Sequence, residues 1–364
     1  MSGKVLMKGN EAFAEAAIRG GCRFYFGYPI TPQNEIPEFM SRELPKRGGV
    51  FLQAESELGA INMAYGAGLA GGRVFTTSSS PGIALMQEGI SFLCSAEVPL
   101  VVLTVCRGGP GVGGIQPGQA DYLQATRGGG NGDYKVPVFA PSSIQEAVDL
   151  LYEAVELADE WQNPIMIFTD GILAQMMEPV VLPEPRPAIK PEEIKKLKPW
   201  ALTGYGDDDS KRTVVKSLRM QPDELEQHVE KLFAKYEKAE KELVRVETIG
   251  VEDAEIVFVA FGTVARIAKE AMELLAQQGV SSGLIRPISL WPFPYDAFDK
   301  LTDKTKVVIS TEMSMGQLIQ DVRIGVGKRF PIKLINRTGG MIPTSLEIAE
   351  RAKAILEEIG GSAK

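Results

Sequence analysis

Short apolar runs that alternate with helix-like stretches constrain the fold of this chain more than any other feature of its sequence. The run at 100–105, Leu-Val-Val-Leu-Thr-Val, is largely apolar on both of the faces that a strand presents. Such a strand must be covered on both sides, as in a parallel sheet whose crossover helices lie above and below it. The alternation therefore predicts an α/β fold built on a parallel sheet.

The length of 364 residues suggests two or three domains, and changes in composition indicate where they divide. Residues 1–185 hold the first α/β unit, and residues 251–364 hold a second one. Between them, 186–250 combine a Pro-rich connection, a predicted solvated turn at 206–210 and a charged helix at 223–246. That helix has an apolar stripe, which predicts packing against a neighbouring domain or subunit; its members are Leu225, Val229, Phe233 and Tyr236.

Charge and hydropathy weigh against two classes of partner. The formal net charge is -8 and no basic stripe is visible, which disfavours nucleic acid. The first residues run into the chain without the apolar stretch of a signal peptide. The longest apolar run, at 98–106, contains a proline and is too short to cross a bilayer. We therefore expect a cytoplasmic protein without a membrane partner.

Few residues of this chain are suited to bind a metal. The cysteines Cys22, Cys94 and Cys106 form no Cys-x-x-Cys pair, and an iron–sulfur cluster usually takes four thiolates. A zinc site based on histidines and a Ser-His-Asp triad are both disfavoured, because His228 is the only histidine. Its position in the charged helix predicts a solvated surface residue.

A proline-locked turn follows the first predicted strand. The aromatic residues at 24–26 favour a strand, and Gly27 interrupts it. Pro29 and Pro32 then disfavour both strand pairing and helix, so the turn should be rigid and should present the hydroxyl of Thr31. Ligands of open α/β sheets bind beyond the carboxyl ends of strands, which makes Thr31 a candidate site residue. A stiff connection without a ligand explains the same pattern.

Arg107 stands where the apolar run at 100–105 ends and a glycine-rich loop at 107–118 begins. A guanidinium at that edge offers a planar fork to a carboxylate, although the sequence alone favours an ion pair with a neighbouring acid. The loop is not a Walker A motif, and its glycines do not open a helix after the first strand as a dinucleotide fingerprint would. A nucleotide site is therefore disfavoured.

Two acidic residues, Glu55 and Glu57, lie at a predicted strand-to-helix junction. The helix dipole alone favours acids in a first turn. Helical phase favours Glu57 for a role in a site, because Ile61 and Tyr65 follow it on the same helix face.

Three motifs in this order resemble the 2-oxoacid:ferredoxin oxidoreductase family: 28–32 (Tyr-Pro-Ile-Thr-Pro), 56–60 (Ser-Glu-Leu-Gly-Ala) and 107–110 (Arg-Gly-Gly-Pro). The segment 284–294 is similar to the transketolase-C-like domain of that family. The resemblance covers essentially the whole chain. It implies a thiamine-diphosphate-binding-type parallel sheet, the pyrimidine domain, followed by a transketolase-C-terminal-like α/β domain.

Within the family, the chain resembles the α subunit of the enzymes that act on branched-chain 2-oxo acids. The loops at 111–119 and 128–134 are more similar to that group than to the 2-oxoglutarate enzymes. The implied activity is the oxidative decarboxylation of a 2-oxo acid such as 3-methyl-2-oxobutanoate, with CoA as co-substrate and ferredoxin as electron acceptor.

The resemblance also implies roles for individual residues. Glu57 would hydrogen-bond the ring nitrogen N1′ of thiamine diphosphate, so that the neighbouring amino group can remove the C2 proton. Thr31 would bind the substrate near its keto group and carboxylate, and Arg107 would hold that carboxylate in a bidentate grip. The implied cofactor-binding residues are Glu57, Tyr28, Pro29, Ile30 and Thr31, and no metal ligand is expected in this chain.

One half of the implied site is missing from the sequence. Thiamine diphosphate enzymes of this type bind the diphosphate and its Mg²⁺ through a Gly-Asp-Gly…Asn segment, and this chain contains no Gly-Asp-Gly. The cysteines for a [4Fe-4S] cluster are absent as well. The resemblance therefore implies a β subunit that supplies both, with further γ and ferredoxin-like δ subunits. The chain should be inactive alone, and the charged helix at 223–246 and the glycine-rich loop are candidate contacts.

Other readings of the sequence stay open. The same chemistry could act on 2-oxoglutarate, pyruvate or indolepyruvate: a second Arg or Lys in the pocket would favour 2-oxoglutarate, and neutral residues would favour a branched chain. A protein of another class, a non-catalytic assembly subunit, could use the same fold. A dinucleotide-dependent dehydrogenase is disfavoured because the fingerprint is absent.

Overall fold

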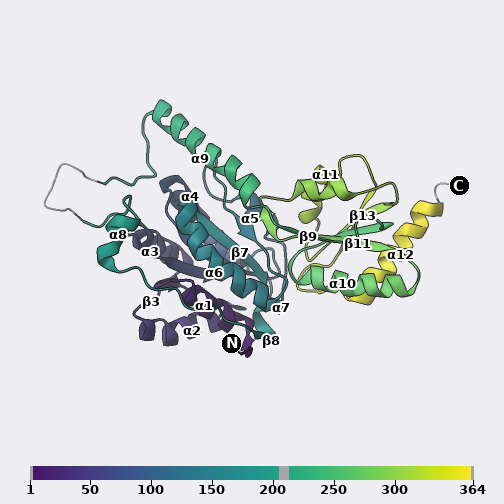
Figure 1. The fold of residues 1–364 in the computed structure, drawn as a ribbon, viewed down its shortest axis with the longest axis horizontal. Helices are drawn as coiled ribbons and strands as arrows, with labels where there is room; N and C mark the ends of the chain where they lie inside the picture. Colours follow the sequence, from purple (N-terminus) through teal and green to yellow (C-terminus); the bar gives the residue numbers. More distant parts are fainter. Residues whose placement is uncertain (1–2, 205–212, 362–364) are drawn as a thin grey trace.

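The computed structural model describes residues 3–204 and 213–361, so the turn predicted at 206–210 lies outside the described residues. The chain forms two α/β units that lie side by side (Figure 1). The sheet of the first unit has seven strands in the order β12-β6-β7-β5-β4-β2-β3. Their bounds are β2 Phe24–Gly27, β3 Val50–Gln53, β4 Val74–Ser78, β5 Leu100–Cys106, β6 Val138–Phe139, β7 Pro164–Asp170 and β12 Ser289–Trp291.

Six strands of this sheet run parallel, and only β12 is antiparallel to its neighbour β6. Helices α1, α2 and α6 pack together on one face, and α3 packs against α4 on the other, as right-handed crossovers require for this strand order. Every residue of β5 and β7 is buried, which confirms the two-sided cover expected from the apolar run at 100–105. The helix bounds are α1 Gly9–Arg19, α2 Glu35–Glu43, α3 Glu57–Leu69, α4 Ser80–Ala96 and α6 Ile144–Trp161.

The second unit has a five-stranded sheet in the order β14-β13-β10-β11-β9. Helices α10 and α12 pack together against this sheet, and α11 packs against the 3-10 helix η2 and β13. Figure 1 shows α10 and α12 on one side of this sheet and α11 on the other. The bounds are β9 Val246–Ile249, β10 Ile256–Val259, α10 Gly262–Gln277, β11 Ser282–Pro287, η2 Tyr295–Lys300, β13 Val307–Glu312, α11 Leu318–Val326, β14 Ile332–Asn336 and α12 Ser345–Gly361.

The two units share a hydrophobic core. Strand β12 follows β11 of the second sheet along the chain but pairs with β6 of the first. Phe261 contacts the rings of Tyr122 and Phe168, each at a centroid distance of 5.7 Å. Asp321, which is fully buried in α11, accepts hydrogen bonds of 2.6 Å from both Tyr122 and Arg127 of the first unit. Because β9 belongs to the second sheet, a division at residue 251 separates this strand from the sheet in which it pairs.

The charged helix is α9, Pro222–Glu242, which lies along the first unit (Figure 1). Its buried seam consists of Leu232, Tyr236 and Ala239, followed by Leu243, whereas Leu225 and Phe233 of the predicted stripe are exposed. The seam therefore packs against this chain itself. His228 is half-buried and its Nε2 lies 2.7 Å from the carbonyl oxygen of Ser95, so the prediction of a solvated histidine was wrong.

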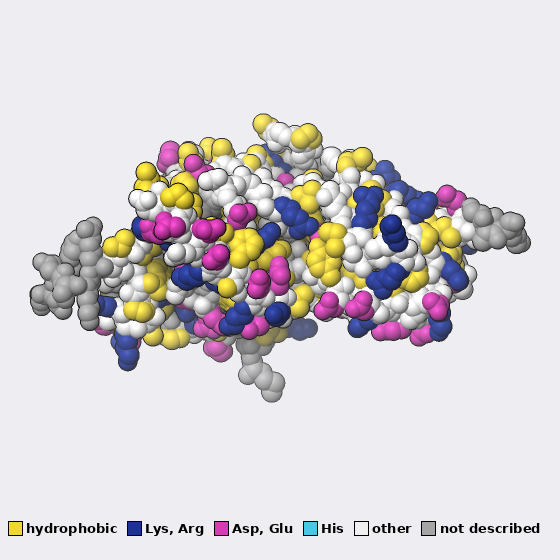
Figure 2. All heavy atoms as spheres, turned by 90° about the horizontal axis from the view of Figure 1, so that it is seen from above, with side chains coloured by type: hydrophobic (Ala, Val, Ile, Leu, Met, Phe, Trp, Pro, Cys, Tyr) yellow, Lys and Arg dark blue, Asp and Glu magenta, His cyan; other side chains and the backbone are white. Residues whose placement is uncertain are grey.

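Shorter elements complete the chain. Strands β1 and β8 form an antiparallel pair that the sequence did not predict. None of the helices in the described ranges is both long and apolar enough to span a membrane. On the face shown in Figure 2, acidic, basic and hydrophobic side chains are interspersed. The remaining bounds are β1 Val5–Lys8, η1 Pro45–Arg47, α5 Tyr122–Arg127, α7 Gly171–Gln175, β8 Met177–Val180 and α8 Pro191–Leu197.

Candidate active site

The parallel strands of the first sheet bring their carboxyl ends to one edge, where the predicted site residues gather. Thr31 lies in the turn after β2, Glu57 follows β3, and Arg107 follows β5. Strand β4 lies between β2 and β5, and Ser78 and Ser80 stand where it ends. This arrangement places residues that are far apart in the sequence at one edge of the sheet, where open α/β sheets bind ligands.

Glu57 is the first residue of α3, and its side chain is almost enclosed, with 5% of the residue exposed. The helix begins here because the hydroxyl of Ser56 accepts a hydrogen bond of 3.1 Å from the backbone N–H of Gly59. The hydroxyl of Ser78 donates a hydrogen bond of 3.3 Å to Oε1 of Glu57. Within the described residues no hydrogen bond reaches Oε2, so this oxygen is available to a ligand. Glu55, by contrast, is exposed.

Gly82, in the first turn of α4, makes room for the carboxylate of Glu57. A Cβ atom at this position would lie 2.3 Å from Oε1 of Glu57 and 2.0 Å from Oγ of Ser78. Both distances are far below van der Waals contact, so any side chain here would displace the carboxylate or the helix. The position of Glu57 therefore depends on a glycine in a different helix.

The turn that carries Thr31 is held from inside the protein. Gln33 is fully buried, accepts a hydrogen bond of 2.5 Å from the hydroxyl of Thr77, and donates one of 3.3 Å to the carbonyl oxygen of Tyr28. The hydroxyl of Thr31 accepts a hydrogen bond of 3.3 Å from the side-chain amide of Asn34. Tyr28 and Pro29 are exposed, while Thr31 is half-buried, as is Ile30.

Arg107 is buried, with 7% of the residue exposed, and forms no ion pair with any described residue. Its Nη1 donates to the carbonyl oxygen of Thr31 and its Nη2 donates to the carbonyl oxygen of Val112, each over 2.8 Å. The Nε atom is buried and has no partner among the described residues. Arg107 therefore joins the Thr31 turn to the tip of the glycine-rich loop. Neither interpretation of its sequence position, as a site for a carboxylate or as a partner of a neighbouring acid, included these contacts to backbone carbonyl groups.

A polar cluster supports Arg107 from behind. The backbone N–H of Arg107 donates a hydrogen bond of 3.0 Å to the hydroxyl of Ser80, which in turn donates to the carboxylate of Asp121. Burial raises the pKa of Asp121 above its ordinary value, although Ser80, Cys106 and Arg107 act in the opposite direction. Burial also raises the pKa of the Cys106 thiol well above its ordinary value, and the nearby Asp121 adds to this effect.

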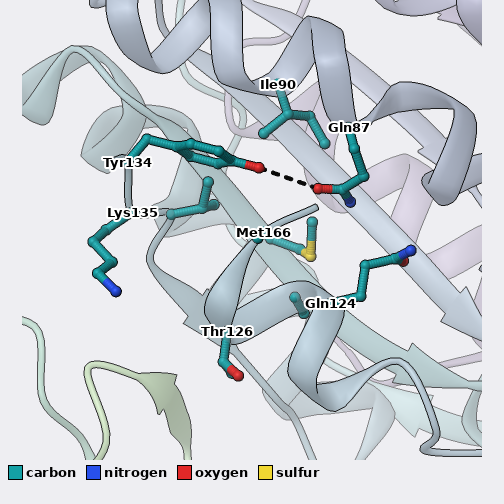
Figure 3. A pocket seen from close by; sticks show the side chains of 10 residues that line it. Gln87, Ile90, Gln124, Thr126, Tyr134, Lys135 and Met166 are labelled. Atoms are coloured by element: carbon teal, nitrogen blue, oxygen red, sulfur yellow. Dashed lines mark hydrogen bonds between the residues drawn. The ribbon is translucent and has the colours of Figure 1, made fainter. Parts of the chain in front are cut away.

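The second loop that carries the resemblance, at 128–134, is anchored on α4. The hydroxyl of Tyr134 accepts hydrogen bonds from the backbone N–H groups of Gly129 and Gly130 and donates one of 3.3 Å to the side chain of Gln87. Figure 3 shows the side chains of Tyr134 and Gln87 pointing toward each other, joined by this hydrogen bond. The glycines thus wrap around one phenol group, and the exposed residues at 131–133 form the tip of the loop.

The structure brings Thr31, Glu57 and Arg107 to one edge of the sheet, linked through Ser78, Ser80 and the Thr31 turn. Sequence reasoning missed Ser78, Gly82 and Asn34. The Ser-Ser-Ser-Pro-Gly segment that ends β4 was a usable signal, because it puts small residues at the carboxyl end of a strand.

These residues fit one half of a thiamine diphosphate site. The enclosed carboxylate with a free oxygen at Glu57 suits the protonated ring nitrogen of an aminopyrimidine. For the diphosphate and its metal the chain offers no Gly-Asp-Gly segment. No group of three or more His, Cys, Asp or Glu side chains comes together as a metal site within residues 3–204 and 213–361.

Two family models match the chain. Residues 15–248 match the model described as pyruvate flavodoxin/ferredoxin oxidoreductase, thiamine diphosphate-binding. Residues 254–348 match the model described as pyruvate:ferredoxin oxidoreductase core domain II. Together the two models span both units of the structure.

Curated relatives and solved structures agree with these models. Ketoisovalerate oxidoreductase subunit VorB of Methanothermobacter thermautotrophicus is 45% identical over 96% of this chain and 97% of its own length. 2-Oxoglutarate synthase subunit KorA of Methanocaldococcus jannaschii is 39% identical over 94% of this chain and 98% of its own. Both relatives are subunits of larger enzymes, as their names state.

Among solved structures, a 2-oxoglutarate:ferredoxin oxidoreductase from Magnetococcus marinus matches with a TM-score of 0.83 and 27% identity, covering 98% of this chain and 66% of the other. A split-gene transketolase matches with a TM-score of 0.58 and 15% identity over 96% of this chain and 98% of the other, so it shares the fold alone. These matches confirm the fold class predicted from the sequence and its motifs. The chain belongs to the 2-oxoacid:ferredoxin oxidoreductase family.

Proposed function

We propose that this chain is the α subunit of an enzyme that oxidatively decarboxylates a branched-chain 2-oxo acid, 3-methyl-2-oxobutanoate, and passes the electrons to ferredoxin. CoA accepts the acyl group. The observation that carries the proposal is the enclosed carboxylate of Glu57 at the sheet edge, beside Thr31 and Arg107. The 45% identity to a ketoisovalerate oxidoreductase subunit, against 39% to a 2-oxoglutarate synthase subunit, favours the branched-chain substrate.

In this proposal Glu57 binds the N1′ side of the aminopyrimidine ring through Oε2, while Ser78 holds Oε1. Thiamine diphosphate, when bound, would supply a nucleophilic carbon for the keto group and a cationic ring that takes up the electron pair released with CO₂. The task of Glu57 is to share a proton with the ring, and it is suited to this because it is kept from bulk water. Tyr28, Pro29 and Ile30 contribute the backbone of the turn that borders the same ring.

Thr31 and Arg107 bind the substrate in this proposal. The amide of Asn34 already donates to the Thr31 hydroxyl, so the hydroxyl hydrogen is left to donate to the keto oxygen. The guanidinium of Arg107 has N–H groups on Nη1 and Nη2 beyond the two that bond to carbonyl oxygens, and these can donate hydrogen bonds to the substrate carboxylate.

A β subunit completes the site in this proposal by binding the diphosphate with Mg²⁺ and by carrying the [4Fe-4S] cluster. Exposed apolar side chains next to the site support a protein partner there: Leu58 beside Glu57, Leu85 on α4 and Val112 at the tip of the glycine-rich loop. Further γ and ferredoxin-like δ subunits complete the complex, and the cytoplasm is its compartment. The alternatives are the same chemistry on 2-oxoglutarate or pyruvate and, in another class, an assembly subunit without a catalytic role.

The variant Glu57→Gln, in the native multi-subunit complex, separates a catalytic from an assembly role. Glutamine keeps the shape but cannot share a proton with the ring, so turnover should fall about 10²- to 10⁴-fold while the complex still assembles. Glu55→Gln is the matched control, because Glu55 lies two residues away and is exposed. Undiminished turnover of the Glu57→Gln complex would contradict the catalytic role of Glu57 and favour the alternative that this chain is a non-catalytic assembly subunit.

A further inference from the structure

A cavity of about 450 Å³ opens between the two units beside Thr31. It is bordered by the Thr31 turn, the glycine-rich loop, the start of α7 and the loop that follows β14. Three of the side chains that line it are isoleucines from three separate segments: Ile115 of the glycine-rich loop, Ile172 of α7 and Ile342 of the second unit. The lining thus combines polar side chains, among them Thr31 and Asn34, with these three isoleucines.

The loop that carries Ile342 is held close to the glycine-rich loop. At Gly340 the backbone has φ +95°, and an added Cβ would lie 2.5 Å from Cβ of Gln116. Gly108 is similarly close to the other loop, since its added Cβ would lie 3.1 Å from the backbone nitrogen of Gly340. This close approach places Ile342 of the second unit at a cavity that begins at Thr31 of the first.

The charges around the cavity disfavour an anionic side chain. None of the described residues that line it is a Lys or an Arg. Its one acid, Glu35, accepts hydrogen bonds from Lys8, Asn10 and Gln175. Burial alone would raise the pKa of Glu35, but these hydrogen bonds outweigh it and hold the pKa below its ordinary value. A second carboxylate on the substrate would therefore meet an ionised acid and no cation from the lining.

We propose that this cavity receives the alkyl side chain of the 2-oxo acid and that Ile342, with Ile115 and Ile172, sets the preference for a branched chain. The inference rests on the proposed function, because the keto group must lie at Thr31 for the side chain to reach the isoleucines. It assigns a part in substrate selection to the second unit, which contributes none of the residues proposed to contact the reacting atoms. Ile342 is 39% exposed and Ile115 is 57% exposed, so both can change without loss of the core.

The test compares kcat/KM of the native complex for 3-methyl-2-oxobutanoate, pyruvate and 2-oxoglutarate. Ile342→Ala should lower the ratio of the branched substrate to pyruvate about tenfold, the range expected for lost methylene contacts. Ile342→Lys should lower the same ratio and raise the ratio of 2-oxoglutarate to the branched substrate. Met341→Ala is the control, because Met341 is the neighbouring residue and does not line the cavity.

Each outcome decides a different claim. Normal turnover with unchanged substrate ratios in both Ile342 variants overturns the inference and leaves the proposed function standing. Absence of turnover with every 2-oxo acid in the wild-type complex overturns both. If the Ile342→Lys complex fails to assemble, the Ile342→Ala variant alone decides, because its smaller side chain requires no displacement of neighbours.

Discussion

The guanidinium of Arg107 donates a hydrogen bond of 2.8 Å from Nη1 to the backbone carbonyl oxygen of Thr31. This contact joins the ends of two strands, β2 and β5, between which β4 lies. Arg107 therefore has a structural task before any substrate binds: it holds the turn that presents the Thr31 hydroxyl. The two residues act as one unit, and their substitutions should not be additive.

Substituting Arg107→Ala should raise KM, by a factor that corresponds to roughly 2–4 kcal/mol if a charged, hydrogen-bonded contact to the substrate carboxylate is lost. It should also lower Tm, because the carbonyl oxygens of Thr31 and Val112 lose their donor. Steady-state kinetics of the complex and thermal unfolding of the chain measure the two effects separately. Arg42→Ala is the control, since the side chain of Arg42 is 55% exposed and pairs with Glu43.

A lower Tm with an unchanged KM would show that Arg107 only holds the turn, and would remove it from the substrate site. A raised KM with an unchanged Tm would show the opposite, that the two carbonyl contacts contribute little to stability.

Much of the fold followed from local sequence, and the parts that did not depend on distant partners. The strand at 100–105 is visible because its own residues are apolar on both faces. Strand β12 could not be predicted from local sequence, because its pairing partner β6 lies far back in the chain and its three residues are too few to show a period. The buried face of α9 also differs from the predicted stripe, because it depends on which side of the helix meets the first unit. Leu232 is buried there, whereas Phe233 of the predicted stripe is exposed.

The candidate site likewise has features that local sequence predicts and features that depend on distant parts of the chain. Helical phase gave only a slight preference for Glu57 over Glu55, and the structure buries Glu57 and exposes Glu55. Phase along one helix says nothing about another helix, so the fit of Gly82 against Glu57 could not be derived. The sequence also does not show that Arg107 donates to backbone carbonyl oxygens rather than to an acid, because these contacts depend on the conformations of the Thr31 turn and the glycine-rich loop.

Stability should depend on pH through Asp121. Its pKa is raised above the ordinary value of 3.8, with burial as the largest cause. In the window above pH 3.8 the native state therefore binds more protons at this residue than the unfolded chain, and the stability that results is lost as pH rises through the folded-state pKa. Asp121→Asn stays neutral, so its free energy of unfolding relative to wild type should increase with pH across this window.

Denaturant unfolding at several pH values from 4 upward measures this difference for Asp121→Asn. Asp133→Asn is the matched control, because Asp133 lies in the exposed tip of the loop at 128–134. Parallel stability curves for wild type and Asp121→Asn would show that burial does not perturb this carboxyl group.

The position of Glu57 can be tested without changing Glu57. In Gly82→Ala the added methyl group would lie 2.3 Å from Oε1 of Glu57, so the carboxylate must move away from the ring nitrogen it is proposed to bind. Turnover of the complex should fall at least tenfold and the apparent affinity for thiamine diphosphate should weaken, with about 1–3 kcal/mol lost in stability from overpacking. In the control Gly360→Ala nothing lies within 4 Å of the new methyl group, so activity should be unchanged and the helix slightly favoured. If Gly82→Ala keeps full turnover and cofactor affinity, the carboxylate of Glu57 does not need its observed position, and the proposed role of Glu57 at the pyrimidine ring fails.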